Sequence, residues 1–212
     1  RVPKWADAGA PRGDVADMPP PRVWNDATRW SIGTPDLVVR TTDVTVKGTA
    51  PDWWGEIPRV PIPIDEDRYV SALEIREEND AGSGGTGRET VGGPFVFHHM
   101  IWSPRVLGED TPDPNVPDDS TSWPVHEVGR EADIFDAKSA RLLRKGSSIV
   151  SDSVHLHSNG RDTTPHLEIA FKFMPRGYKP EYRRATYALG NGVDIDIRAM
   201  EPNQQLHAYA LL

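Results

Sequence analysis

Short apolar segments separated by Gly, Pro and polar residues recur along the chain. β-Branched and aromatic residues concentrate in six of them, which predicts strands at residues 36–40, 44–47, 69–75, 95–102, 148–157 and 167–173. A last pair of strands is predicted at residues 193–199 and 205–212. Segments of this length are typical of strands rather than of helices. The pattern therefore predicts an all-β fold, a jelly-roll-like antiparallel β-sandwich with long loops.

Proline and glycine divide the chain into three parts. Residues 1–35 are rich in Pro and predict a semi-rigid connector, residues 36–180 hold the predicted sandwich, and residues 181–212 hold a linker and the predicted last pair of strands. Two long loops are expected inside the sandwich, at residues 77–94 and 104–124. Loops of that length are usually functional or mobile.

Composition excludes several classes of partner and of chemistry. The chain has 212 residues, with 32 acidic against 24 basic side chains and a formal charge of −8, so it offers no basic field for nucleic acid or anionic lipid. No apolar stretch is long enough for a membrane span. The chain starts at Arg1 rather than at Met, and we expect a processed or partial chain. With no Cys, any metal must be held by His, carboxylate or Met.

Histidines carry the main chemical signal. Two of the predicted strands contain tight groups, His98 with His99 and His155 with His157. Neutral imidazole suits copper or zinc. Neighbouring residues of a regular strand point to opposite faces, so a metal shared by His98 and His99 requires a bend or a site at the strand edge. His155 and His157 are two residues apart and are expected to face the same way.

Other aromatic and histidine positions have structural explanations. The His98–His99 pair can also be two hydrogen-bonded core histidines of a hydrophobic strand. His126 and His166 are predicted at the surface or beside a ligand, and His207 is predicted to be a structural strand residue. The seven Trp residues, which include Trp53 and Trp54, are predicted to pack in the core and at interfaces.

Three segments together resemble a known metalloprotein family. They are Ile-Pro-Ile-Asp-Glu-Asp-Arg-Tyr-Val at residues 62–70, Phe-His-His-Met at 97–100, and Gly-Ser-Ser-Ile-Val at 146–150 leading to Val-His-Leu at 154–156. In this order they resemble the first copper domain of the ascorbate-dependent type II copper monooxygenases, the family of peptidylglycine α-hydroxylating monooxygenase and dopamine β-monooxygenase. The resemblance covers about residues 36–173. It implies that His98, His99 and His155 hold the electron-transferring copper, whereas His157 has no counterpart.

The flanks extend the resemblance. Residues 5–14 look like the end of a c-type cytochrome module, which precedes such domains in some multidomain bacterial proteins, although no Cys-x-x-Cys-His haem site is present. Residues 193–212 look like the opening strands of a second copper domain, whose oxygen-activating site would lie beyond Leu212. The implied partners are that second domain and a cytochrome-like electron donor. The implied location is extracytoplasmic, either periplasmic or secreted. The disulfides of the animal members are missing.

The expected function is that of a copper-binding, electron-transferring half of a monooxygenase-like oxidoreductase, with no catalytic acid or base assigned. On this view the segment alone does not complete the reaction, because it lacks the second copper site. One alternative is a non-catalytic binding or assembly module of a larger extracytoplasmic complex. Another is a zinc hydrolase, since three His ligands also describe catalytic zinc, with Glu127 as the candidate general base.

Overall fold

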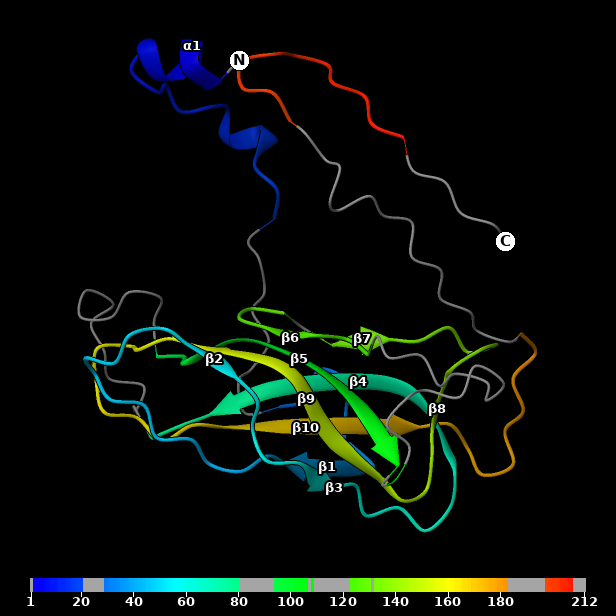
Figure 1. Cartoon of the computed structure of the whole chain (residues 1–212). Coiled ribbons are helices and arrows are strands. Elements are labelled where there is room, and N and C mark those ends of the chain that lie inside the picture. The colour runs from blue at the N-terminus through cyan, green and yellow to red at the C-terminus, as the bar shows by residue number, and fades with distance from the viewer. Residues whose placement is uncertain are drawn as a thin grey trace.

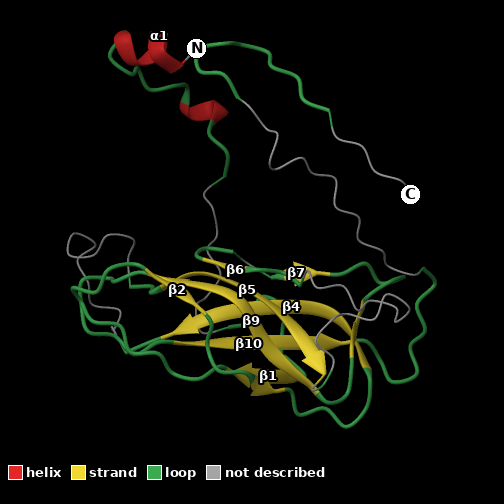
Figure 2. Cartoon of the chain, viewed as in Figure 1, coloured by secondary structure: helices red, strands yellow, loops and turns green. Residues whose placement is uncertain are grey.

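The computed structural model describes residues 2–20, 29–80, 94–106, 108, 123–130, 132–182 and 197–207. Within these ranges the strands form two antiparallel sheets that pack face to face (Figure 1, Figure 2). The first sheet has the order β1 (Leu37–Arg40), β10 (His166–Phe173), β4 (Arg68–Glu78) and β7 (Asp133–Ile134), with β8 (Arg141–Leu143) also paired to β4. The second has the order β2 (Trp53–Gly55), β9 (Ser147–Leu156), β5 (Phe97–Val106) and β6 (His126–Glu127), with β3 (Val60–Pro61) also paired to β9. The predicted all-β sandwich is confirmed.

The hydrophobic core lies between the two sheets. Inward-facing residues of the long strands are completely buried, among them Leu73 on β4, Trp102 on β5, Val154 on β9 and Phe171 on β10. Burying side chains of this kind stabilises the fold by about 1.5 to 3 kcal/mol each relative to leaving them exposed. Outward-facing positions of the same strands are therefore the ones available for function.

The central strands were predicted correctly from the sequence, but their ends were not. Five of the six predicted segments contain a strand, whereas residues 44–47 form only an isolated bridge, between Val46 and Thr163. β4 continues to Glu78 and β5 to Val106, so both long loops begin later than predicted. The second loop was predicted to begin at Pro104, but this residue pairs with Ile149 inside β5. The remainder of these loops, at 81–93, 107 and 109–122, lies outside the described residues.

The predicted last pair of strands is wrong where the structure describes it. Residues 197–199 and 205–207 are not in strands, while residues 193–196 and 208–212 lie outside the described part of the chain. The backbone N–H and C=O of Arg198 bond to the side chain of Gln204 instead of to a partner strand. Met200 and Asn203, which lie between the two predicted strands, adopt positive φ angles of 65° and 59°.

The predicted connector contains short elements and is anchored at its end. α1 (Val2–Asp7) and a 3₁₀ turn at Val15–Asp17 bury no residue and stand apart from the sheets in Figure 1. The segment from residue 29 onward is attached to β4. Glu74 accepts hydrogen bonds from the backbone of Ser31 and Ile32, and the Arg76 guanidinium lies 4.2 Å from the ring centre of Trp30.

Among the described residues, no helix has the length and apolar character that crossing a membrane requires.

Candidate metal centre

A β-bulge in β5 brings two neighbouring histidines to the same surface. Phe97 pairs with Leu156 and His99 pairs with His155, so two steps along β5 match one step along β9 and His98 is the extra residue. Phe97 and the following Met100 stay fully buried in the core. The bend that the sequence required for a shared site is therefore present, and it falls at His98.

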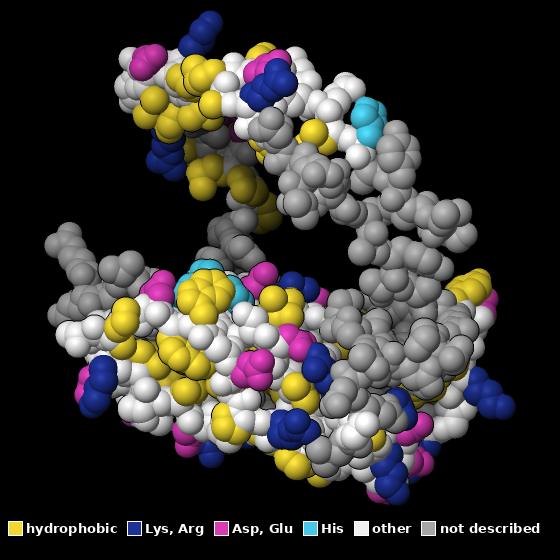
Figure 3. Space-filling model, viewed as in Figure 1, with side chains coloured by type: hydrophobic (Ala, Val, Ile, Leu, Met, Phe, Trp, Pro, Cys, Tyr) yellow, Lys and Arg dark blue, Asp and Glu magenta, His cyan; other side chains and the backbone are white. Residues whose placement is uncertain are grey.

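His98, His99 and His155 converge at the bulge. One ring nitrogen from each lies within 4.8 Å of the others, and the Nδ1 atoms of His98 and His99 are 3.1 Å apart. Two nitrogens bound to one ion at about 2.0 to 2.1 Å in tetrahedral geometry lie about 3.3 Å apart, so this spacing is close to that of a ligand pair. Figure 3 shows histidine side chains grouped on the surface of the sandwich beside an exposed hydrophobic side chain. The convergence expected from the sequence is present.

The third histidine is enclosed by β2. Trp54 lies opposite His155 in the β2–β9 register, and the two rings stack with their centroids 3.8 Å apart and their planes at 7°. Asp52 places a carboxylate oxygen 3.2 Å from Nε2 of His155. His155 is consequently only 8% exposed although it faces outward from the sandwich. Its Nδ1 is buried and has no hydrogen-bond partner.

The surroundings of His99 favour its neutral imidazole. Burial lowers the pKa of His99, and the neighbouring His155 and His98 lower it further, against an opposing effect of Glu127. Glu127 pairs with His99 in the β5–β6 register, but its carboxylate is outside the group of converging ligand atoms. Since a metal binds the unprotonated nitrogen of imidazole, a lowered pKa keeps His99 ready to act as a ligand near neutral pH.

A buried carboxylate from the opposite sheet fixes the backbone just before the bulge. Glu77 on β4 accepts hydrogen bonds from the N–H groups of Val96 and Phe97 at distances of 2.7 to 3.0 Å. Burial raises the pKa of Glu77, while these bonds and one from Asn79 act in the opposite direction. The sequence alone did not single out Glu77, because its role depends on contact between sheets.

His157 and His166 lie outside the cluster. Nε2 of His157 is 3.2 Å from the carbonyl oxygen of Phe95, although its ring is near that of His98, with centroids 5.6 Å apart. His166 belongs to the other sheet, where its Nδ1 is 3.4 Å from a carboxylate oxygen of Asp43. Neither residue contributes to the converging atoms.

Two further histidines were predicted only in part or wrongly. His126 was expected at the surface or beside a ligand. It is 6% exposed and therefore not at the surface, but it lies on β6 opposite Met100, next to His99. Burial, with a smaller effect of His99, lowers its pKa to about 4. His207 was expected in a strand, but it is exposed and lies in a segment without secondary structure. In both cases the deciding feature is tertiary, since the short β6 and the turn after Met200 leave little trace in the hydrophobic pattern.

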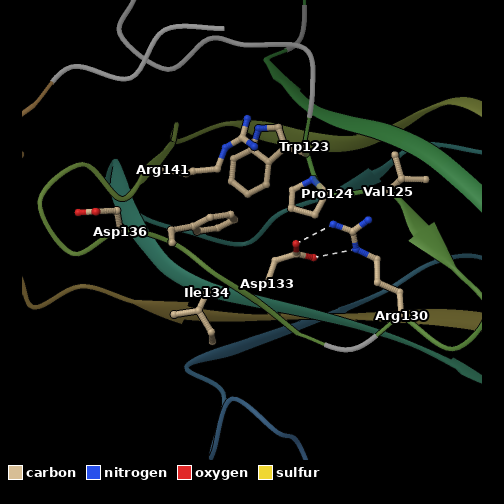
Figure 4. Close-up of a pocket in the computed structure, with 9 residues that line it drawn as sticks. Trp123, Pro124, Val125, Arg130, Asp133, Ile134, Asp136 and Arg141 are labelled. Atoms are coloured by element: carbon tan, nitrogen blue, oxygen red, sulfur yellow. Dashed lines mark hydrogen bonds and ion pairs between the residues drawn. The ribbon is translucent and has the colours of Figure 1, made fainter. Parts of the chain in front are cut away.

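A separate cavity of 410 Å³ lies beside β7, and Figure 4 shows the residues around it. An ion pair between Arg130 and Asp133 spans part of its wall, with a distance of 2.7 Å. The guanidinium of the buried Arg141 lies 4.5 Å from the ring centre of Trp123. The lining includes none of the three converging histidines. The histidine cluster is thus a surface site of the second sheet and not part of this cavity.

Comparisons with protein-family models, with curated proteins and with solved structures give no match to this chain. The fold and the cluster themselves define an antiparallel β-sandwich with three convergent imidazoles on the outer face of one sheet. The buried, unpartnered Nδ1 of His155 and the imidazole nitrogens of its neighbours fit a borderline transition metal such as copper or zinc.

Proposed function

We propose that this chain binds one copper ion through His98, His99 and His155 and serves as the electron-transferring half of an oxidoreductase of the type II copper monooxygenase kind. The observation that supports the proposal most directly is the convergence of three imidazole nitrogens within 4.8 Å, at a bulge that places two sequence neighbours together. The family resemblance of the same three residues supports copper as the metal.

The donor set favours a metal that accepts nitrogen ligands alone. Cys is missing from the whole sequence, and the thioether of Met100 is buried in the core, so neither thiolate nor thioether sulfur is available at the cluster. Neutral imidazoles hold both Cu(I) and Cu(II), and a site without thiolate is not a blue-copper centre. Copper bound there would accept and donate one electron.

The three histidines would hold the ion from positions of different kinds. His99 and His155 come from paired positions of two central strands, and their backbones are fixed by the ladder between β5 and β9. His98, the bulged residue, is exposed and leaves one side of the cluster accessible. A site closed by strands on one side and open on the other suits electron exchange with a partner.

The proposed partners follow from the resemblance. Hydroxylation of a substrate would take place in a second copper domain, placed beyond Leu212 in a longer protein, and a cytochrome-like module would donate electrons. We propose an extracytoplasmic location, in the periplasm or outside the cell. The rival proposal, a non-catalytic binding or assembly module, needs the fold but no redox-active metal.

A metal titration tests the proposal. The metal-free chain is titrated with Cu(I) under anaerobic conditions against a chromophoric chelator, and with Cu(II) followed by electron paramagnetic resonance. We expect one copper per chain, a type II spectrum with nitrogen hyperfine structure, and uptake of one electron per copper from ascorbate.

Three outcomes would contradict the proposal. Failure to bind copper would favour the non-catalytic module. Bound copper that ascorbate cannot reduce would remove the electron-transfer role. Zinc that displaces copper at equal concentration, together with hydrolysis of model esters that Glu127→Gln abolishes, would favour a zinc hydrolase in which Glu127 is the general base.

A further inference from the structure

We infer that Asp52 and Trp54 form a clamp that positions His155 for metal binding. The inference rests on the proposed metal site, but it concerns two side chains that are not ligands of that site. Asp52 immediately precedes β2 and Trp54 lies within it, and β2 pairs with β9 on the side away from β5. His155 therefore has the clamp on one side and His99 on the other.

The carboxylate of Asp52 sets which nitrogen of His155 is free. The Oδ2 atom of Asp52 lies 3.2 Å from Nε2 of His155. Within the described residues, His155 is the hydrogen-bond and ion-pair partner of Asp52. An Nε2–H group that donates to this carboxylate leaves Nδ1 as the unprotonated nitrogen, and Nδ1 is the buried atom without a partner. Carboxylates that accept from the remote nitrogen of a ligating histidine fix its orientation and make it a stronger donor.

The indole of Trp54 fixes the plane of the imidazole. The two rings are stacked almost in parallel, at 3.8 Å and 7°, and the strand register holds Trp54 directly opposite His155. The same indole also contacts His99, with centroids 5.2 Å apart and ring planes at 60°. Trp54 nevertheless remains 59% exposed, so it covers the histidine without being part of the hydrophobic core. Its position is explained by the ring contacts and not by core packing.

The clamp acts on one ligand of three. Its loss should therefore weaken the metal site without abolishing it, unlike the loss of a ligand. It should also change the state of His155 in the metal-free protein, because both contacts exist without an ion. Because of this second consequence, the clamp can be tested independently of the proposed copper function.

The test uses the whole chain and two pairs of matched variants. Asp52→Ala is compared with Asp43→Ala, because Asp43 also places a carboxylate oxygen near a histidine, 3.4 Å from Nδ1 of His166 on the other sheet, although its closer partner is Arg40. Trp54→Leu is compared with Trp53→Leu, its neighbour on β2. Asp52→Asn serves as a partial rescue, since an amide oxygen accepts a hydrogen bond without carrying charge. Each variant is measured by ¹⁵N NMR of the histidine rings without metal, and by Cu(I) titration.

We expect Asp52→Ala to decrease the Nε2–H tautomer of His155 and to raise the copper dissociation constant about tenfold to a hundredfold. Asp52→Asn should fall between it and the wild type. Trp54→Leu should remove the upfield ring-current shift of the His155 ring protons and raise the dissociation constant about threefold to tenfold. Both control variants should match the wild type.

Unchanged tautomer, ring-current shift and affinity in the clamp variants would overturn the inference, as would equal changes in the controls. If the wild-type chain binds no copper, the proposed function fails. The tautomer and ring-current measurements on the metal-free chain then show by themselves whether Asp52 and Trp54 hold His155 in place.

Discussion

His99 of β5 lies directly opposite His155 of β9, and their ring centroids are 5.3 Å apart. Directly opposed residues of an antiparallel pair have their Cβ atoms about 4.5 to 5.5 Å apart, so the ladder alone brings these two imidazoles into contact. The bulge then adds His98 to the same surface. Two of the three converging imidazoles are positioned by regular pairing and the third by an irregularity.

Replacement of single histidines should separate the ligands from their neighbour. We expect His155→Ala to abolish stoichiometric copper binding, because it removes one of three converging donors. His157→Ala should leave about one copper per chain, because its Nε2 lies beside a backbone carbonyl of residue 95 and not in the cluster. Copper analysis after dialysis measures both. Equal loss in the two variants would show that His157 is a ligand.

Glu77 should support both stability and the metal site. In Glu77→Gln the charged acceptor of the Val96 and Phe97 N–H groups is lost, and we expect the free energy of unfolding to fall by about 2 kcal/mol. Copper affinity should fall with it, because these bonds hold the chain just before His98. Urea unfolding and copper titration provide the measurements. The exposed neighbour Glu78 offers the control variant Glu78→Gln, and an equal effect there would refute the role of Glu77.

His126 should make the fold sensitive to acid. Its pKa is about 4 in the folded chain against an ordinary value of 6.5, so between these pH values the unfolded chain binds a proton that the folded chain does not. Stability from this group is therefore full above pH 6.5 and is lost as the pH falls towards 4, by about 3 kcal/mol in total. Urea unfolding from pH 7 to 4 measures the loss. His126→Gln should flatten that part of the profile, and an unchanged slope would contradict the explanation.

Residues 1–212 loaded with copper should not hydroxylate substrates by themselves. On the proposed function, the copper of this chain only stores an electron, and oxygen would bind at the copper of a second domain. The assay supplies ascorbate, oxygen and a panel of peptides and amines, and we expect copper reduction without product. Stoichiometric hydroxylated product would move the oxygen chemistry to the cluster of His98, His99 and His155.

The long strands and the residues of the histidine cluster could be predicted because their signals are local. The apolar runs at β4, β5, β9 and β10 are visible in the sequence, and so are the two histidine groups. Alternation along a strand indicated that His98 and His99 need a bend to share a site, but it could not locate the bulge. That position depends on the register with β9, in which Phe97 meets Leu156 and His99 meets His155.

The surroundings of the three histidines could not be predicted, because they depend on pairing between distant segments. Trp54 was expected to pack in the core or at an interface, and only the β2–β9 register places it on His155. The contact between Asp52 and the same histidine spans more than a hundred residues of sequence. The five short strands have too few residues for a periodic signal, as β6 shows with only His126 and Glu127.

The pairing of β9 with both β2 and β5 has a consequence for the order of folding. Residues 107–146 separate β5 from β9, and β2 precedes both, so the three strands meet only when long stretches of chain have closed. Closing such loops costs entropy before their contacts repay it, which makes non-local sheets slow to form. His98 and His99 are neighbours in the unfolded chain, whereas His155 joins them only in the assembled sheet. A complete three-nitrogen site would thus exist only in molecules that have finished folding, and tight retention of metal would distinguish them from folding intermediates.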